Sequence, residues 1–257
     1  MAESAALLHV EGLSKHFGAV TATDNLNLHI APGELHALIG PNGAGKTTAV
    51  AQIAGELRPD SGRIVFAGHT ITDWPIQRRV KLGLARSYQI TSLFPQFTAL
   101  DNVALAVQAH QGHSLRVWRN ARRDPRLREP ARLWLEKLGL AGRDEIPAAE
   151  LAHGEQRQLE LAMALATNPR LLLLDEPMAG MGSEDSQRLI ALLRVLKRDY
   201  TILLVEHDMD AVFALADRIT VLVYGQAIAC DTPQAIRVNE QVRTAYLGES
   251  EQYSRSS

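Results

Sequence analysis

A glycine-rich stretch, GPNGAGKTT at residues 40–48, has the spacing of a phosphate-binding loop. It follows the apolar run LHALIG and precedes a stretch in which Val50 and Leu57 fall on one helical face, so the order is strand, loop and helix. Glycines let the backbone N–H groups point at phosphates, and the helix N-terminus adds a positive end. We expect Lys46 to bridge the β- and γ-phosphates of a nucleotide and Thr47 to ligate Mg²⁺. The residues of this loop are Gly40, Pro41, Asn42, Gly43, Ala44, Gly45, Lys46, Thr47 and Thr48.

Two carboxylates at the end of a second buried strand complete such a site. The run LLLLDEP (171–177) places Asp175 and Glu176 at the carboxyl end of the strand, where ligands collect in open α/β sheets. We expect Asp175 to hold Mg²⁺ through water and Glu176 to orient and polarise the attacking water. An acid after a strand is often only a helix cap, but its pairing with the phosphate loop favours the catalytic interpretation.

Two further polar residues stand where a phosphate sensor and a metal ligand are needed. His207 follows the strand-like run TILLVE, and its place after the acidic pair suggests a hydrogen bond to the γ-phosphate. Gln89, in RSYQI, closes the nucleotide core and could reach Mg²⁺ and the attacking water. Either residue alone is uninformative, because a histidine after a strand is commonly structural and a glutamine commonly lies on the surface.

The elements that position these residues have the pattern of a parallel sheet. The runs LLLLD, TILLVEH and ITVLVYG are separated by helical stretches such as 184–197, which predicts strands covered on both faces. The region from about 92 to 150 has helical periodicity and a dense arginine cluster between residues 116 and 132. That cluster is either a solvated helical face or a contact with anionic lipid headgroups. Two helix starts follow, at Thr232-Pro233 and at Asn239.

Composition limits the compartment and the partners. The chain has 257 residues and a net charge of −2, which does not indicate nucleic acid as a partner. Its single cysteine excludes an intrachain disulfide. The start lacks the basic region of an export signal, and no segment approaches the roughly 20 apolar residues of a membrane span. We expect a cytosolic protein, or one docked on a membrane from the cytosolic side.

The ordered set of motifs resembles the ATP-binding subunit of an ABC transporter over nearly the whole chain. The resemblance implies an α/β fold: a P-loop NTPase (RecA-like) core, an N-terminal antiparallel β subdomain and an inserted α-helical subdomain. The expected core comprises residues 1–91 and 154–231, the helical signature subdomain 92–153, and a C-terminal helical tail 232–257. By the same resemblance, Phe17 stacks on adenine, and Gln89, the Asp175 and Glu176 pair, and His207 are the Q-loop, Walker B pair and switch histidine.

The stretch LAHGEQR at residues 151–157 matches the family's signature motif, usually spelled L-S-G-G-Q. A helix that begins at a glycine presents unpaired N–H groups to an anion, but the chain's own phosphates are already held by the P-loop. We therefore expect this motif to serve the ATP of a facing subunit. Its contact residues are Ala152, His153, Gly154 and Glu155.

Some positions depart from the family's pattern. Ala152 replaces the usual serine, and the loop MAGMG (178–182) leaves Gly182 where an aspartate is typical. The signature helix, DEPMAGMG and the terminal AYLGE are similar to ATPases of branched-chain amino acid importers, including their amide and urea relatives. That resemblance implies ATP and Mg²⁺ as cofactors, a second ATPase subunit in a homo- or heterodimer, two permease subunits and an extracytoplasmic binding protein. It also implies a peripheral location on the cytoplasmic side of the inner membrane.

Two other functions fit parts of the sequence. A soluble ABC-type switch acting on DNA or ribosomes would share the motifs, but such proteins usually carry coiled coils, zinc modules or two nucleotide domains. A subunit that only binds nucleotide is suggested by Ala152 and Gly182, but the retained Glu176 and His207 argue against it. The sequence favours an ATP-hydrolysing subunit of a membrane importer.

Overall fold

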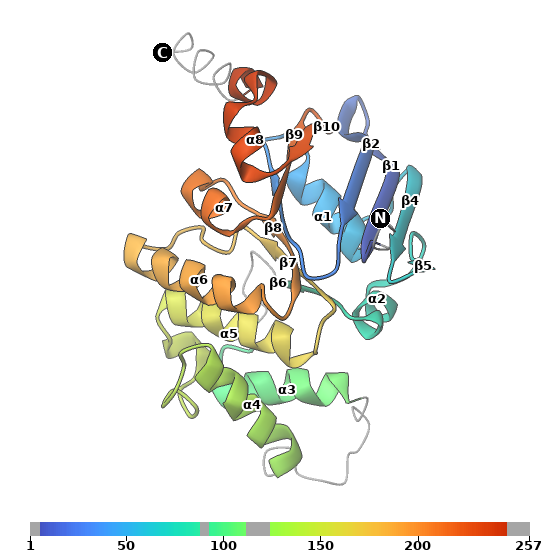
Figure 1. The fold of residues 1–257 in the computed structure, drawn as a ribbon. Helices are drawn as coiled ribbons and strands as arrows, with labels where there is room; N and C mark the ends of the chain where they lie inside the picture. Colours follow the sequence, from blue (N-terminus) through green and yellow to red (C-terminus); the bar gives the residue numbers. More distant parts are fainter. Residues whose placement is uncertain (1–5, 88–92, 112–123, 246–257) are drawn as a thin grey trace.

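The computed structural model describes residues 6–87, 93–111 and 124–245, which form two sheets and a set of helices (Figure 1). The strands are β1 (Leu8–Phe17), β2 (Val20–Ile30), β3 (Leu35–Ile39), β4 (Ser61–Phe66), β5 (His69–Thr70), β6 (Leu84–Ser87), β7 (Leu171–Asp175), β8 (Thr201–Val205), β9 (Arg218–Val223) and β10 (Gln226–Asp231). The helices are α1 (Lys46–Ala54), α2 (Ile76–Leu82), α3 (Ala99–His110), α4 (Pro125–Lys137), the 3₁₀ helix η2 (Ala148–Glu150), α5 (His153–Ala166), α6 (Ser183–Leu196), α7 (Met209–Leu215) and α8 (Pro233–Val238).

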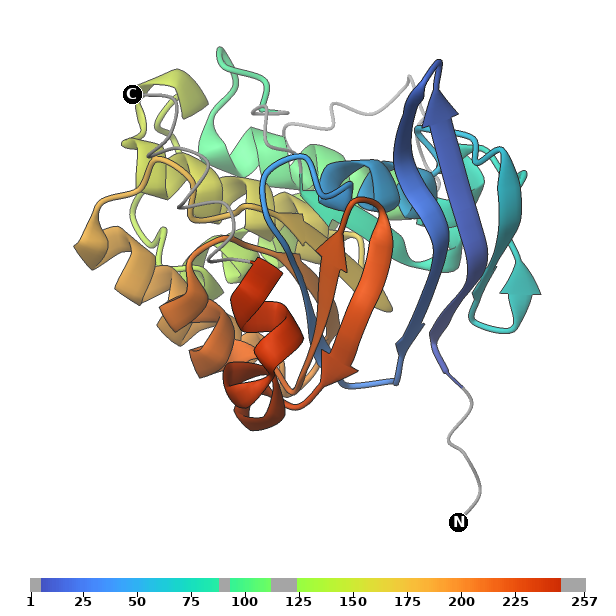
Figure 2. The same ribbon diagram turned by 90° about the horizontal axis from the view of Figure 1, so that it is seen from above.

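The two sheets differ in direction. Strands β2, β1, β4 and β5 form an antiparallel sheet in that order, and the second sheet has the order β10-β9-β3-β8-β7-β6. Its members from β9 to β6 are parallel, and β10 is added antiparallel at one edge. Seen from above, α1 lies between the antiparallel sheet and the parallel one (Figure 2). The predicted α/β fold with an antiparallel β subdomain is confirmed.

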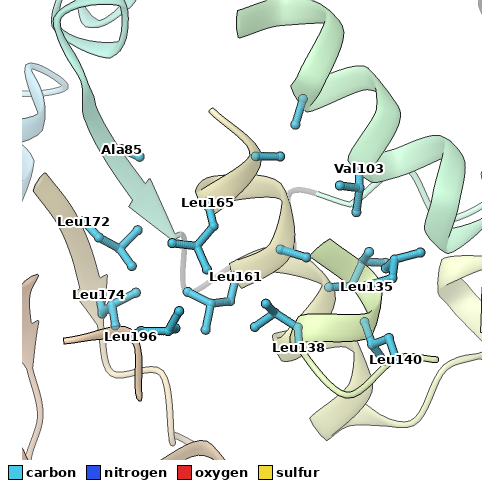
Figure 3. Packing of buried hydrophobic residues seen from close by; sticks show 14 of the residues in the cluster. Ala85, Val103, Leu135, Leu138, Leu140, Leu161, Leu165, Leu172, Leu174 and Leu196 are labelled. Carbon is cyan, nitrogen blue, oxygen red and sulfur yellow. The ribbon is translucent and has the colours of Figure 1, made fainter. Parts of the chain in front are cut away.

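Alternate residues of the parallel strands pack on opposite faces. In β7, Leu171 and Leu173 pack with α1 and the antiparallel sheet, whereas Leu172 and Leu174 pack with α5 and α6. This two-sided burial explains why the strands are continuous apolar runs. In Figure 3, Leu165 of α5 lies beside the β7 side chains, and α3 and α4 cover the far side of α5.

The helix that follows the phosphate loop is shorter than the sequence predicts. It ends at Ala54, because Gly55 adopts a left-handed conformation (φ 87°) and returns its N–H to the carbonyl of Ala51, so Leu57 lies outside it. The buried Arg79 guanidinium donates to the carbonyls of Gln52 and Ile53 at 2.8 and 2.7 Å. A cation on the last carbonyls of a helix is favourable, so Arg79 fixes the end of α1 and thereby the loop before it.

The inserted helices α3 and α4 pack on each other and on α5, and α5 also contacts β6. The signature helix is therefore in contact with both the core and the insertion, and the boundary at residue 153 stays a prediction. Arg128 pairs with Asp101 and Glu145, and Arg132 pairs with Asp144, so this part of the arginine cluster forms ion pairs on a helical surface. Residues 116–123 of the cluster lie outside the described part of the chain.

The two helix starts after β10 are confirmed. The Thr232 hydroxyl accepts from Ala235 N–H at the start of α8, and the Asn239 side chain accepts from Gln241 N–H and Val242 N–H. Within the described ranges, no helix combines the length and the apolar character needed to cross a membrane.

Replacement of Leu165 by alanine tests whether α5 is held by this core. Leu165 is fully buried, so Leu165→Ala should lower the free energy of unfolding by about 2–5 kcal/mol, through lost burial and a residual cavity. Leu133→Ala, on the exposed face of α4 where the side chain is 58% accessible, should cost less than about 0.5 kcal/mol. Chemical denaturation measures both values; equal losses would contradict the packing described.

Candidate functional site

The phosphate loop requires glycine at positions where the backbone is crowded. Gly40 and Gly45 have φ values of 154° and 100°, and a methyl group built on them would lie 2.0 Å from the Leu222 carbonyl oxygen and 1.9 Å from that of Ala22. No side chain caps α1 at Gly45, and its first turn carries no acid. The start of α1 therefore has the features of an anion site, and the binding of phosphate there stays a prediction.

The Lys46 side chain folds back onto the phosphate loop. Its ammonium group donates to the carbonyl of Gly40 at 2.6 Å and to that of Pro41 at 3.0 Å, and the residue is buried. A hydrogen bond from an ammonium group to a charged phosphate is stronger than one to a neutral carbonyl, so Lys46 would bind a phosphate in preference to these carbonyls. Thr47, the next residue, is exposed, so its hydroxyl is accessible to a ligand.

Strand register brings the phosphate loop, the acidic pair and the segment with His207 to the same end of the parallel sheet. Val205 of β8 is opposite both Leu38 of β3 and Asp175 of β7, so these residues form a row across the sheet. Because neighbouring strands are about 4.8 Å apart, the ends of β3 and β7 are separated by about 10 Å. The phosphate loop, the acidic pair and His207 therefore follow adjacent strands at the same edge.

Asp175 fits the role of a metal ligand. Its side chain is buried, Oδ2 accepts from Arg86 Nη2 at 2.7 Å, and Oδ1 has no hydrogen-bond partner among the described residues. Burial raises the pKa of the Asp175 carboxyl, while Arg86 opposes that rise. A buried carboxylate oxygen without a partner is costly, and a hydrated Mg²⁺ would satisfy it.

Glu176 is held in a strained conformation directly after Asp175. Its φ is 48°, in the left-handed region that non-glycine residues seldom adopt, and its N–H donates to the Val205 carbonyl at 2.8 Å. Its side chain is only partly buried. Backbone strain of this kind is concentrated at functional sites, which agrees with a chemical role for Glu176.

Sequence reasoning missed Glu206 and Arg86. Glu206, between β8 and His207, is fully buried, and its carboxylate accepts from Met178 N–H at 2.9 Å and His207 N–H at 3.1 Å. His207 itself is exposed. Glu206 directly follows a buried strand, as Glu176 does, so the same pattern could have found it. No signal in the sequence pairs Arg86 with Asp175, which is 89 positions away.

Phe17 lies at the tip of the β1–β2 hairpin. It is 51% exposed and is paired with Val20, and the same hairpin contacts the phosphate loop at Ala22. Asp60 supports this end of β1 by accepting from Lys15 Nζ and His16 N–H, both at 2.7 Å. These hydrogen bonds hold the pKa of Asp60 down to about 2. An exposed aromatic ring beside the loop is suited to stack on a nucleotide base.

The start of α5 has no side-chain cap. Ala152 offers no oxygen to the N–H groups of the first turn, and Glu155 reaches back to Ala152 N–H at 3.0 Å while pairing with Arg143. A methyl group on Gly154 would lie 3.1 Å from the Asp185 carboxylate at the start of α6. The N-cap residue thus leaves the first turn of α5 without a side-chain acceptor of its own, and this helix start lies beside α6, whereas the phosphate loop lies against β2.

Gln89 lies outside the described residues, so its position stays a prediction. The strand before it ends at Ser87, which is opposite Leu174, one residue before Asp175. The strand that precedes Gln89, β6, thus ends at the same edge of the sheet as the acidic pair.

Comparison with known proteins identifies the family. A family model described as ABC transporter matches residues 23–179, and one described as branched-chain amino acid ATP-binding cassette transporter matches residues 228–252. Among solved structures, the ADP conformation of MJ1267, an ATP-binding cassette of an ABC transporter, aligns with a TM-score of 0.83 and 28% identity, covering 95% of this chain and 99% of that one.

Two curated relatives cover almost the full length. The high-affinity branched-chain amino acid transport ATP-binding protein LivG of Escherichia coli K12 is 38% identical over 95% of this chain and 98% of its own length. BraF of Pseudomonas aeruginosa, with the same description, is 36% identical over the same shares. The chain belongs to the ABC transporter family, as an ATP-binding subunit that hydrolyses ATP.

Proposed function

We propose that this ATPase drives the import of branched-chain amino acids through a separate permease, from the cytoplasmic face of the inner membrane. The observation that carries the cargo class is full-length similarity to LivG and BraF, which are described as branched-chain amino acid transport proteins, together with the match at residues 228–252. An extracytoplasmic binding protein would deliver the cargo to the permease. Amide and urea importers are the alternatives that a transport assay separates.

The residues at the sheet edge divide the chemistry of hydrolysis among them. Lys46 and the N–H groups of the loop bind the phosphates, and Phe17 stacks on the base. Thr47, Gln89 and Asp175 would hold Mg²⁺, which when bound neutralises charge on the β- and γ-phosphates. Asp175 Oδ1, which has no hydrogen-bond partner within the described part of the chain, supports this assignment.

Glu176 and His207 act on the water and the γ-phosphate. Glu176 orients the attacking water and accepts its proton. Its strained backbone and its place directly after Asp175 support this role. His207 is exposed at the end of the neighbouring strand and donates a hydrogen bond to the γ-phosphate.

Two copies, or this chain and a related ATPase, would complete each other's sites. The uncapped start of α5 at Ala152 supports this arrangement, because the phosphates bound at Gly45 are held against β2 and the start of α5 lies beside α6. ATP held between the P-loop of one subunit and Gly154 of the other would join the two subunits, and hydrolysis would release them.

Replacement of the base tests the catalytic assignment. Glu176→Gln should lower ATP turnover roughly 100-fold or more, because the amide cannot accept the water's proton, while ATP binding persists. The bound ATP should then trap a dimer, which size-exclusion chromatography with and without Mg-ATP detects. Glu136→Gln, an exposed acid on α4, is the matched control. Undiminished hydrolysis in Glu176→Gln would refute the assignment.

A cavity between the core and the inserted helices supports the proposed contact with a permease. It has a volume of about 220 Å³, and its lining includes Ile76 and Val80 of α2 and Met163 and Ala164 of α5. Arg86, which pairs with Asp175, also lines it. A permease segment in this groove would contact both the core and the inserted helices, and it would touch Arg86, the partner of the proposed Mg²⁺ ligand Asp175.

A charge placed in the groove should block assembly with the permease. Val80 is 40% exposed, so Val80→Asp should fold with a melting temperature near wild type but lose co-purification with the permease. Val195→Asp, at a 57% exposed position on α6 away from the groove, is the control and should retain the permease. Uptake of labelled leucine, urea and a short amide by the assembled transporter checks the cargo. Equal permease recovery with both variants would contradict the groove assignment.

A further inference from the structure

Glu206 carries a fully buried carboxylate that the proposed mechanism leaves without a role. Within residues 6–87, 93–111 and 124–245, the one ion-pair partner recorded for it is His207, whose Nδ1 lies 3.8 Å from Oε2. A buried acid costs free energy unless hydrogen bonds compensate it. Burial raises the pKa of the Glu206 carboxyl, although backbone N–H groups of Met178, His207 and Asp208 oppose the rise.

The two oxygens of Glu206 connect two different loops. Oε1 accepts from Met178 N–H at 2.9 Å, in the loop that begins after Glu176. Oε2 accepts from His207 N–H at 3.1 Å. Since Glu176 N–H also donates to the Val205 carbonyl, the loop after β7 is joined to the end of β8 at two successive points. One side chain therefore sets the spacing between the segment that carries the base and the segment that carries the sensor.

The far end of the first loop contacts the signature helix. A methyl group built on Gly180 would lie 3.8 Å from His153 Cε1, so the loop that starts at Met178 reaches the start of α5 within a few residues. The path therefore runs from His207 through Glu206 to Met178 by hydrogen bonds, and then along the loop to Gly180, which lies beside His153. This path joins a residue of the chain's own nucleotide site to the helix start that faces the other site.

We propose that Glu206 is a positioning residue that holds His207 and the loop 178–182 in fixed register, so that displacement of the loop at the signature helix is transmitted to His207. The proposal rests on the roles assigned above to Glu176 and His207. A carboxylate suits this task better than an amide, because both of its oxygens accept hydrogen bonds. In glutamine, the amide nitrogen would face an N–H group and leave one of the two connections broken.

The test compares Glu206→Gln with Glu34→Gln in the purified full-length chain. Glu34 is the matched control because its mostly buried carboxylate also accepts a backbone N–H, from Ala31 at 2.8 Å, but it precedes β3 at the opposite edge of the sheet. Amide hydrogen exchange is measured over residues 176–182 and 206–208, and steady-state kinetics give kcat and KM for ATP. A melting temperature for each variant reports any general loss of stability.

We expect Glu206→Gln to speed exchange in both segments and to lower kcat roughly tenfold, through misplacement of His207. KM for ATP should stay within about twofold, because the P-loop is untouched. Glu34→Gln should leave exchange in both segments and kcat unchanged. Unchanged exchange or unchanged kcat in Glu206→Gln, or an equal effect of Glu34→Gln, would overturn the proposal.

Glu176→Gln, measured in the same series, separates the two levels of inference. If Glu176→Gln loses hydrolysis while Glu206→Gln does not, the positioning role fails and the proposed base stands. If Glu176→Gln still hydrolyses ATP, the assignment on which the proposal rests fails, whatever Glu206→Gln does.

Discussion

The proposed site depends on the backbone N–H groups at two helix starts. Gly45 is the N-cap of α1 and Ala152 is the N-cap of α5, and neither residue offers a side-chain hydrogen bond to the first turn. Such groups are normally satisfied by a side chain, water or ligand, and a phosphate satisfies several at once. The start of α1 lies against β2, whereas the start of α5 lies beside α6. We propose that the second helix start acts on the nucleotide of a neighbouring subunit.

The register of the parallel strands places the residues of the proposed catalytic site together. The row of Leu38, Val205 and Asp175 brings three loops to one edge, and the buried strands leave little freedom for any of them to move alone. Polar contacts then refine the positions, with Arg86 on Asp175 and Glu206 on the loops beside it. The buried sheet thus fixes where the three loops begin, and the side-chain contacts fix how they are arranged there.

The sequence predicts the strands and the phosphate loop well, because the spacing of Gly40, Gly45 and Lys46 is dictated by phosphate geometry. It predicts less where tertiary contacts decide. Leu57 fits the helical pattern, yet α1 ends earlier because Gly55 turns the chain and the distant Arg79 caps its carbonyls. The contact of Arg86 with Asp175 likewise joins strands far apart in the chain. Assigned roles for Phe17, Gln89 and the signature residues depend on a bound nucleotide and a second subunit, so they remain proposals.

Mixing two defective chains tests the shared site most directly. One variant, Lys46→Ala, cannot hold phosphate in its own loop but keeps its signature helix. The other, Gly154→Asp, keeps its loop but places a negative charge at the start of α5. We predict that neither hydrolyses ATP alone and that single-turnover hydrolysis returns in the mixture, where one of the two sites contains only intact parts. A mixture as inactive as its components would contradict a site shared between two copies of this chain, and full hydrolysis by Gly154→Asp alone would contradict the shared site altogether.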